Sequence, residues 1–191
     1  MLVFFETLLK ICFFKAKPQD LPAGRQWMII STVLIIGATI LASLSKESSN
    51  QIVLFALTQV ALYALIIWII LKLKGVQSRW LQTITALFGT SFLLQLVAIP
   101  FSGDINTIDS GTIKISNDLL IIFTISIWNL FIVAFILKQA LENSFFAALV
   151  LAFFAQAISL TLALSFVGAP AIDPVLSNLQ LNSNLADFIN V

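Results

Sequence analysis

Histidine is absent from the 191 residues, and Cys12 is the only cysteine. A disulfide within the chain is therefore impossible, and zinc, haem or iron–sulfur sites lack their usual ligands. A Ser–His–Asp triad has no base, and the GxSxG, GxGxxG and GxxxxGK[ST] motifs are missing. We therefore expect no enzymatic activity, no cofactor and no metal site.

Charge is also scarce. Charged residues make up 10% of the chain and hydrophobic residues 60%, whereas a soluble domain carries about 25% charged residues. This composition is typical of an integral membrane protein. The net charge of +1 gives no broad positive field, so we expect no nucleic-acid partner.

Long uncharged runs define the expected fold. A helix needs about 20 mostly apolar residues to cross a bilayer, and a central charge costs about 2.5 to 3.5 kcal/mol. The sequence predicts an all-α polytopic membrane protein whose bundle, residues 27–167, contains five transmembrane helices. The expected spans are 27–44, 52–71, 81–101, 119–137 and 145–167.

Basic residues indicate the orientation, because cytoplasmic loops hold an excess of Lys and Arg. Eight of the ten basic residues fall in segments that would lie on the same side of the membrane as the N-terminus. We expect a multi-pass protein of the cell (inner or plasma) membrane, with a cytoplasmic N-terminus and a non-cytoplasmic C-terminus. The eight residues are Lys10, Lys15, Lys17, Arg25, Lys72, Lys74, Arg79 and Lys138.

Residues 1–17 predict an amphipathic helix at the membrane interface. On a helix, Glu6, Lys10 and Lys17 share a narrow sector, and apolar side chains cover the rest. A basic n-region followed by an apolar core would indicate a secretory signal, but here the order is reversed. A helix packed on the bundle is a compatible interpretation. Cys12 could carry a lipid here, or serve as an ordinary apolar residue.

Residues 18–26 predict a turn between this helix and the first span. Pro22 and Gly24 favour a change of chain direction, and Trp27 is typical of a membrane interface. We expect Asp20, Leu21, Pro22, Gly24 and Trp27 to form a membrane-entry corner.

Uncharged polar residues inside the spans allow two interpretations. They commonly form hydrogen bonds between helices, and this is the interpretation we favour. Alternatively, Gln59, Gln95, Asn129 and Gln156 line a path for a solute. The other uncharged polar residues inside the spans are Thr58, Thr85, Thr90, Ser91, Ser126, Ser159 and Thr161.

The last span carries small residues at alternating spacings of four and three. Such a stripe allows a neighbouring helix to approach closely, so we expect it to pack inside the bundle or against another subunit. Its members are Ala148, Ala152, Ala155, Ser159 and Ala163. The preceding span instead presents bulky aromatics, which suit a lipid-facing or partner-facing surface: Phe123, Trp128, Phe131 and Phe135.

The tail, residues 168–191, is expected on the non-cytoplasmic side. It contains two prolines and several asparagines but also recurring apolar residues, more than a disordered tail requires. We interpret it as a segment packed on its own outer loop, with docking to a partner protein as the alternative.

Two short stretches resemble the Yip (Ypt-interacting protein) family of five-span membrane proteins. They are QDLPAGRQW, which contains Asp20 and Leu21, and GVQSRWLQTITALFGTSFLLQLVAIP, from Gly75 to Pro100. The sequence differs from the family in having Pro22-Ala23-Gly24 where Tyr-Gly-Pro is usual in eukaryotic members. The resemblance implies a short, bacterial-type member with a non-enzymatic accessory or trafficking role.

These features favour an accessory or scaffold subunit of a larger membrane assembly. Its expected partners are the lipid bilayer, other membrane subunits and further copies of the chain. The alternative is a carrier or channel for a small neutral or lipidic solute.

Overall fold

The computed structural model describes residues 2–43, 49–101 and 117–167. Predictions about residues 102–116 and the tail 168–191 lie outside these ranges.

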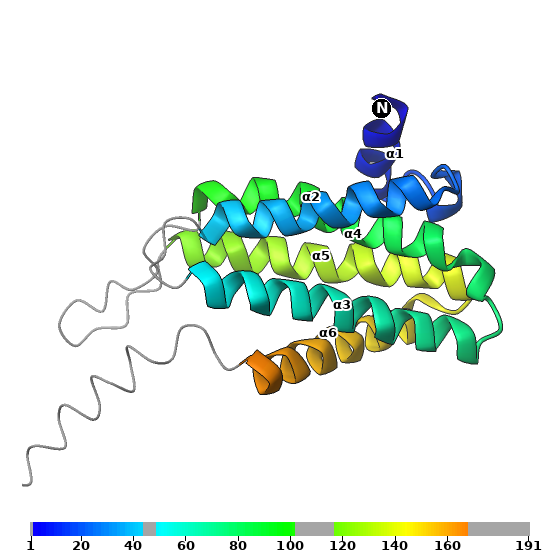
Figure 1. Ribbon diagram of the computed structural model, residues 1–191. Helices are drawn as coiled ribbons and strands as arrows, with labels where there is room; N and C mark the ends of the chain where they lie inside the picture. Colours follow the sequence, from blue (N-terminus) through cyan, green and yellow to red (C-terminus); the bar gives the residue numbers. More distant parts are fainter. Residues whose placement is uncertain (1, 44–48, 102–116, 168–191) are drawn as a thin grey trace, which may run out of the picture.

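Within the described ranges, all regular secondary structure is helical (Figure 1). Five of the helices are long and apolar enough to cross a membrane. The expected all-α, five-span polytopic fold is thereby confirmed. The α-helices are α1 (Leu2–Cys12), α2 (Arg25–Ser43), α3 (Ser49–Leu73), α4 (Trp80–Ala98), α5 (Asn117–Leu141) and α6 (Phe145–Val167), and the short 3-10 helices are η1 (Pro18–Asp20), η2 (Gln77–Arg79) and η3 (Ile99–Phe101).

The helix ends differ modestly from the uncharged runs. α3 continues through Lys72 and α5 through Lys138, because a lysine stem can lie along apolar surface while its ammonium reaches water. α4 ends at Ala98, and the chain continues directly into η3; Ile99 keeps helical dihedrals (φ −51°, ψ −47°) although it precedes Pro100. Gly89 does not interrupt α4.

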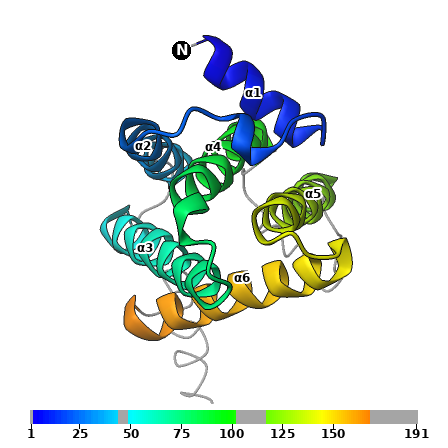
Figure 2. The same ribbon diagram turned by 90° about the vertical axis from the view of Figure 1, so that its right-hand side faces the viewer.

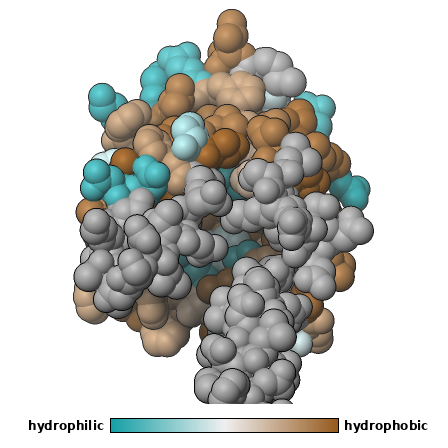
Figure 3. All heavy atoms as spheres, turned by 90° about the vertical axis from the view of Figure 1, so that its left-hand side faces the viewer, coloured by the Kyte–Doolittle hydropathy of each residue, from teal (hydrophilic) through white to brown (hydrophobic). Residues whose placement is uncertain are grey.

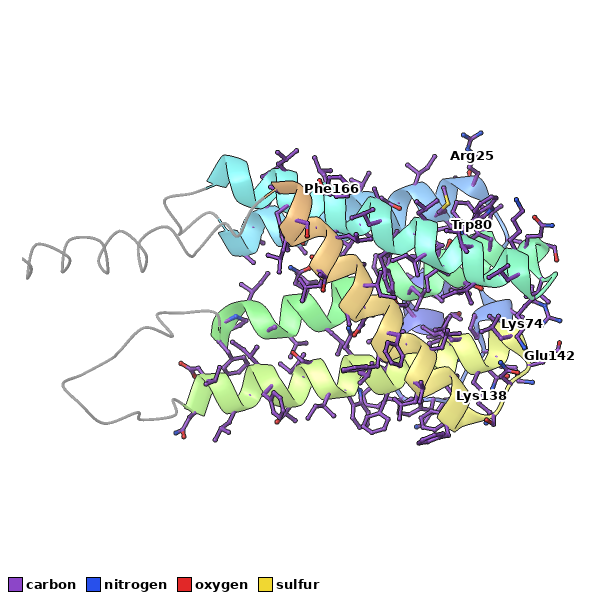
Figure 4. The ribbon with its side chains drawn as sticks, turned by 90° about the horizontal axis from the view of Figure 1, so that it is seen from below. Arg25, Lys74, Trp80, Lys138, Glu142 and Phe166 are labelled. Carbon is purple, nitrogen blue, oxygen red and sulfur yellow. The ribbon has the colours of Figure 1, made fainter. Side chains whose placement is uncertain are left out.

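The helices form a bundle in which α4 packs against α2 and α5, while α6 crosses α3 and α5 (Figure 2). We call the end where α3 joins α4 and α5 joins α6 the basic end. Lys74 and Lys138 lie there, and Phe166 lies at the opposite end (Figure 4).

The buried core is concentrated toward the basic end. In α4 the continuous buried run is Thr83–Thr90, and in α5 every buried residue lies between Ile132 and Leu141. The half of α5 from Asn117 to Phe131 contains no buried residue. In α4 and α5, burial therefore lies in the half nearer the basic end.

α1 lies across the outside of α4, between α2 and α5 (Figure 2). Leu8 is fully buried and sits over Gly89, where a Cβ atom would meet both Leu8 methyls at 2.7 Å. At 1.5 Å per residue this contact is about 14 Å along α4 from its start at Trp80. α1 is therefore packed on the bundle. Its placement at a membrane interface stays a prediction.

Three helices, α1, α3 and α5, are followed by a residue at positive φ. Gly75 (φ 72°) follows α3. Glycine is the usual residue in this left-handed conformation after a helix. Phe14 (φ 60°) follows α1 and Glu142 (φ 53°) follows α5, although a left-handed conformation costs a non-glycine residue about 1 to 2 kcal/mol. α1 ends at Cys12, so the predicted helix over residues 1–17 is too long, and Lys17 lies beyond its end.

Candidate functional site

The predicted membrane-entry corner is an ordered turn. The backbone N–H of Lys17 donates to the Asp20 carboxylate at 2.7 Å, and Leu21 is buried. Pro22 is exposed, and the carbonyl of Gly24 accepts the N–H of Trp27 as α2 begins. The Trp27 ring stacks on Phe4 of α1 with centroids 4.6 Å apart. The corner thereby connects α1 to α2.

Two glutamines that were not predicted as site residues connect this corner to the bundle. Gln82 Nε2, on α4, donates to the carbonyls of Leu21 (3.2 Å) and Gln19 (3.4 Å). Gln19 Nε2 in turn donates to the carbonyl of Gln139 on α5 at 3.1 Å. No periodicity marks these glutamines, because each one bonds a backbone group far away in the sequence.

Arg79 closes the same end from η2. Its guanidinium donates to the Ala140 carbonyl at 3.3 Å and pairs with Glu142 at 2.7 Å. This ion pair stabilises the left-handed conformation of Glu142. The contacts of the Phe14 ring with Trp128 and Phe135 do the same for Phe14. Glu142 is one of few acidic residues in the predicted cytoplasmic segments. Its scarcity among basic residues was the sequence signal that could have indicated an ion pair here. Together these contacts make a hydrogen-bonded polar cap at the basic end.

Replacing Gln82 with Leu should loosen the corner without unfolding the bundle. Two backbone carbonyls lose their donor, and an unmet buried group costs about 1 to 3 kcal/mol. We expect faster proteolysis within residues 17–24 and a loss of about 1 to 2 kcal/mol in the free energy of unfolding. The matched control is Gln26→Leu, because Gln26 is exposed. Equal effects of the two changes would contradict the role of Gln82.

The outward side of α1 carries the predicted Glu6 and Lys10 pair, with Nζ and Oε1 2.7 Å apart. The hydrogen bond and charge of Lys10 hold the pKa of Glu6 below its ordinary value. Cys12 is on the opposite, buried side, where loss of water raises the pKa of its thiol to about 11. A buried, protonated thiol behaves as an apolar packing residue.

Two of the four predicted intramembrane amides bridge helices. Gln95 Nε2 on α4 donates to Thr39 Oγ1 on α2 at 3.1 Å. Ser91 on α4 donates to Asn129 Oδ1 on α5 at 3.4 Å. These contacts join α4 to both of its neighbours.

The other two amides have no such bond. Gln59 and Gln156 lie near the middle of α3 and α6 and are half-buried, and these two helices pack together. Among the described residues, neither side-chain amide forms a hydrogen bond. An amide at membrane depth without a hydrogen-bond partner is unfavourable by several kcal/mol.

The expectation that the hydroxyls bond between helices is wrong for most of them. They donate instead to a carbonyl of their own helix, three or four residues earlier. That acceptor is always within reach, so no second helix is needed. The residues concerned are Thr58, Thr85, Thr90, Ser126, Ser159 and Thr161.

The small-residue stripe of α6 faces the bundle. Its five residues are the buried residues of α6, each at most 2% exposed. α6 crosses α3 and α5 along this side (Figure 4). The aromatics of α5 lie outside, with Phe123, Trp128 and Phe131 exposed and Phe135 half-buried under Phe14.

Fold and site together define an all-α multi-pass membrane protein with a hydrogen-bonded cap at its basic end and polar residues at membrane depth. Compared with models of known protein families, with curated proteins and with solved structures, the chain matches none of them. The resemblance to the Yip family therefore depends only on the residues quoted for it.

Proposed function

We propose that the protein is a non-enzymatic accessory or scaffold subunit of a larger membrane assembly. The observation that carries this proposal is the pair of half-buried amides, Gln59 and Gln156, which lack a partner among the described residues. A polar side chain from a neighbouring transmembrane helix would satisfy both. That helix would belong to another subunit or to a second copy of the chain.

Two further features support a contact role. The half of α5 from Asn117 to Phe131 has no buried residue, so its surface is available to lipid or to another helix. The Yip resemblance also implies an accessory role. In this proposal the basic end faces the cytoplasm of a cell (inner or plasma) membrane, because that end collects the basic residues of the loops.

The proposal is tested by replacing both amides, Gln59→Leu and Gln156→Leu, and extracting the protein mildly from its native membrane. We expect the wild type to migrate with a stoichiometric partner chain. The amount of partner extracted with the double variant should fall at least about tenfold, since each interhelical polar contact contributes about 1 to 2 kcal/mol.

The matched control changes the adjacent hydroxyl on α3 and a nearby one on α6, Thr58→Val and Thr161→Val. Both hydroxyls bond their own helix, so the control should retain the partner. A wild-type chain that migrates as a lone monomer would contradict the proposal, as would a double variant that keeps its partner.

A carrier or channel for a small neutral or lipidic solute is the second candidate. Seen from the end opposite the basic end, hydrophilic side chains are visible in the middle of the bundle between apolar ones (Figure 3). Gln59, Gln95, Asn129 and Gln156 would line the path. The purified chain alone should then change solute flux in liposomes, and flux should fall in the Gln59→Leu, Gln156→Leu variant.

A further inference from the structure

The chain segment that follows α1 lies along the basic half of α5. The Phe14 ring meets Phe135 and Trp128 edge-on, with centroids 5.2 and 5.5 Å apart. Five residues later, Gln19 Nε2 bonds the Gln139 carbonyl at 3.1 Å. Lys138 lies between these two points on α5, and Lys15 and Lys17 lie between the corresponding points of the segment. The fold thus brings three lysines to one corner of the basic end.

The exposure and the surroundings of these lysines leave positive charge at this corner. Lys15 and Lys17 are exposed, and Lys138 is half-buried. Two carboxylates lie near this corner: Asp20 accepts the Lys17 backbone N–H, a hydrogen bond that does not neutralise its charge, and Glu142 pairs with Arg79. Among the described residues, three ammonium groups beside the one unpaired carboxylate leave the corner with a net positive charge. Within the part of the chain that the structure describes, none of the three lysines forms an ion pair.

An aromatic wall continues from this corner along α5. Trp128, Phe131 and Phe135 follow spacings of three and four, so they share a side of the helix with Lys138. Trp128 is 42% and Phe131 37% exposed, and Phe131 stacks on Phe145 of α6 with centroids 6.2 Å apart. The wall runs from the lysines toward the centre of the bundle's length.

We propose that this surface binds one phospholipid with an anionic headgroup. The three ammonium groups would hold the phosphate, and an acyl chain would lie along the aromatic wall. Positive charge next to apolar membrane-facing surface is the combination that anionic lipids match, because headgroup and tail occupy adjacent depths. The neutral headgroup of phosphatidylcholine gives no net attraction to the cluster. The proposal does not depend on the accessory role.

Trp128 supplies a local reporter for the experiment. A chain that retains Trp128 alone (Trp27→Phe, Trp68→Phe, Trp80→Phe) is reconstituted in phosphatidylcholine vesicles containing brominated phosphatidylglycerol, and in vesicles with the label on the other lipid. Bromine quenches tryptophan fluorescence at contact, so the ratio reports which lipid occupies the wall. We expect phosphatidylglycerol to be enriched about fivefold over the bulk, and less at high salt.

Two charge variants decide whether a site exists. Lys15→Gln, Lys17→Gln, Lys138→Gln should abolish the enrichment. The control Arg25→Gln, Lys72→Gln, Lys74→Gln removes as many positive charges from the same end and should preserve it. If both variants lose the enrichment equally, the lipid is attracted by the overall charge of this end and the proposed site is wrong. The absence of enrichment in the starting protein would also overturn the proposal.

A third arm separates a lipid headgroup from free phosphate. Inorganic phosphate at matched ionic strength should compete no better than chloride, and stronger competition would overturn the assignment to a lipid. If the single-tryptophan chain does not fold, native mass spectrometry of the natural chain and its two charge variants counts retained phosphatidylglycerol directly. Retention by the Lys15, Lys17, Lys138 variant would then contradict the site.

Discussion

Ala152→Leu should destabilise the bundle by about 2 to 3 kcal/mol, which is within the range for overpacking a filled core. Ala152 is fully buried on the side of α6 that crosses α3 and α5. A leucine adds three carbon atoms where the neighbouring helix is already in contact. α6 must move away, and Ala148 and Ala155 lose their contacts with it. Equilibrium unfolding in detergent measures the change.

The matched control is Ala147→Leu, on the same helix but exposed. The same side chain there has no filled space to enter, so the free energy of unfolding should change by less than about 0.5 kcal/mol. If the two variants unfold alike, the stripe is not a packing surface, and the close approach of α6 is wrong.

The spans and the stripe were predictable because each depends on one strong physical term. A charge at membrane depth is so unfavourable that uncharged runs mark the helices, and small residues at regular spacing mark close helix contact. The hydroxyls were less predictable, since Thr58 satisfies itself within α3 whereas Ser91 reaches Asn129. Which of two available acceptors a hydroxyl chooses depends on distances that spacing does not contain.

The cap at the basic end was hidden for a different reason. Gln82 bonds the carbonyls of Gln19 and Leu21, and backbone acceptors leave no trace in side-chain identity. Phe14 and Glu142 adopt a conformation that usually requires glycine, so local preferences placed the end of α1 too late. Long-range contacts through an aromatic ring and an arginine decide these turns.

Gly89→Leu should release α1 from the bundle. Even a Cβ atom at Gly89 would lie 2.7 Å from both methyls of Leu8, and Leu8 is fully buried and has no free space beside it. A leucine there cannot coexist with the docked helix. Because α1 is joined to α2 only through the corner, it can detach while the five spans remain folded.

The only cysteine of the chain reports this release. Docked, Cys12 is buried and its thiol pKa is raised to about 11, whereas the ordinary value is 9.0. Return to the ordinary pKa increases the thiolate about a hundredfold at neutral pH, and lower intrinsic nucleophilicity offsets part of that gain. Alkylation by a maleimide should therefore become at least about tenfold faster in Gly89→Leu, with further gain from access.

Two variants show whether the close contact is the cause. Gly37→Leu places the same side chain on α2 where nothing lies within 4 Å of the glycine, so Cys12 should stay protected. Leu8→Ala combined with Gly89→Ala removes the obstructing methyls and restores room for one Cβ, so Cys12 should be more protected than in Gly89→Ala alone. Slow alkylation in Gly89→Leu would mean that α1 does not depend on this contact. Fast alkylation in Gly37→Leu would mean that any leucine in the bundle frees α1, and the contact between Leu8 and Gly89 would lose its special role.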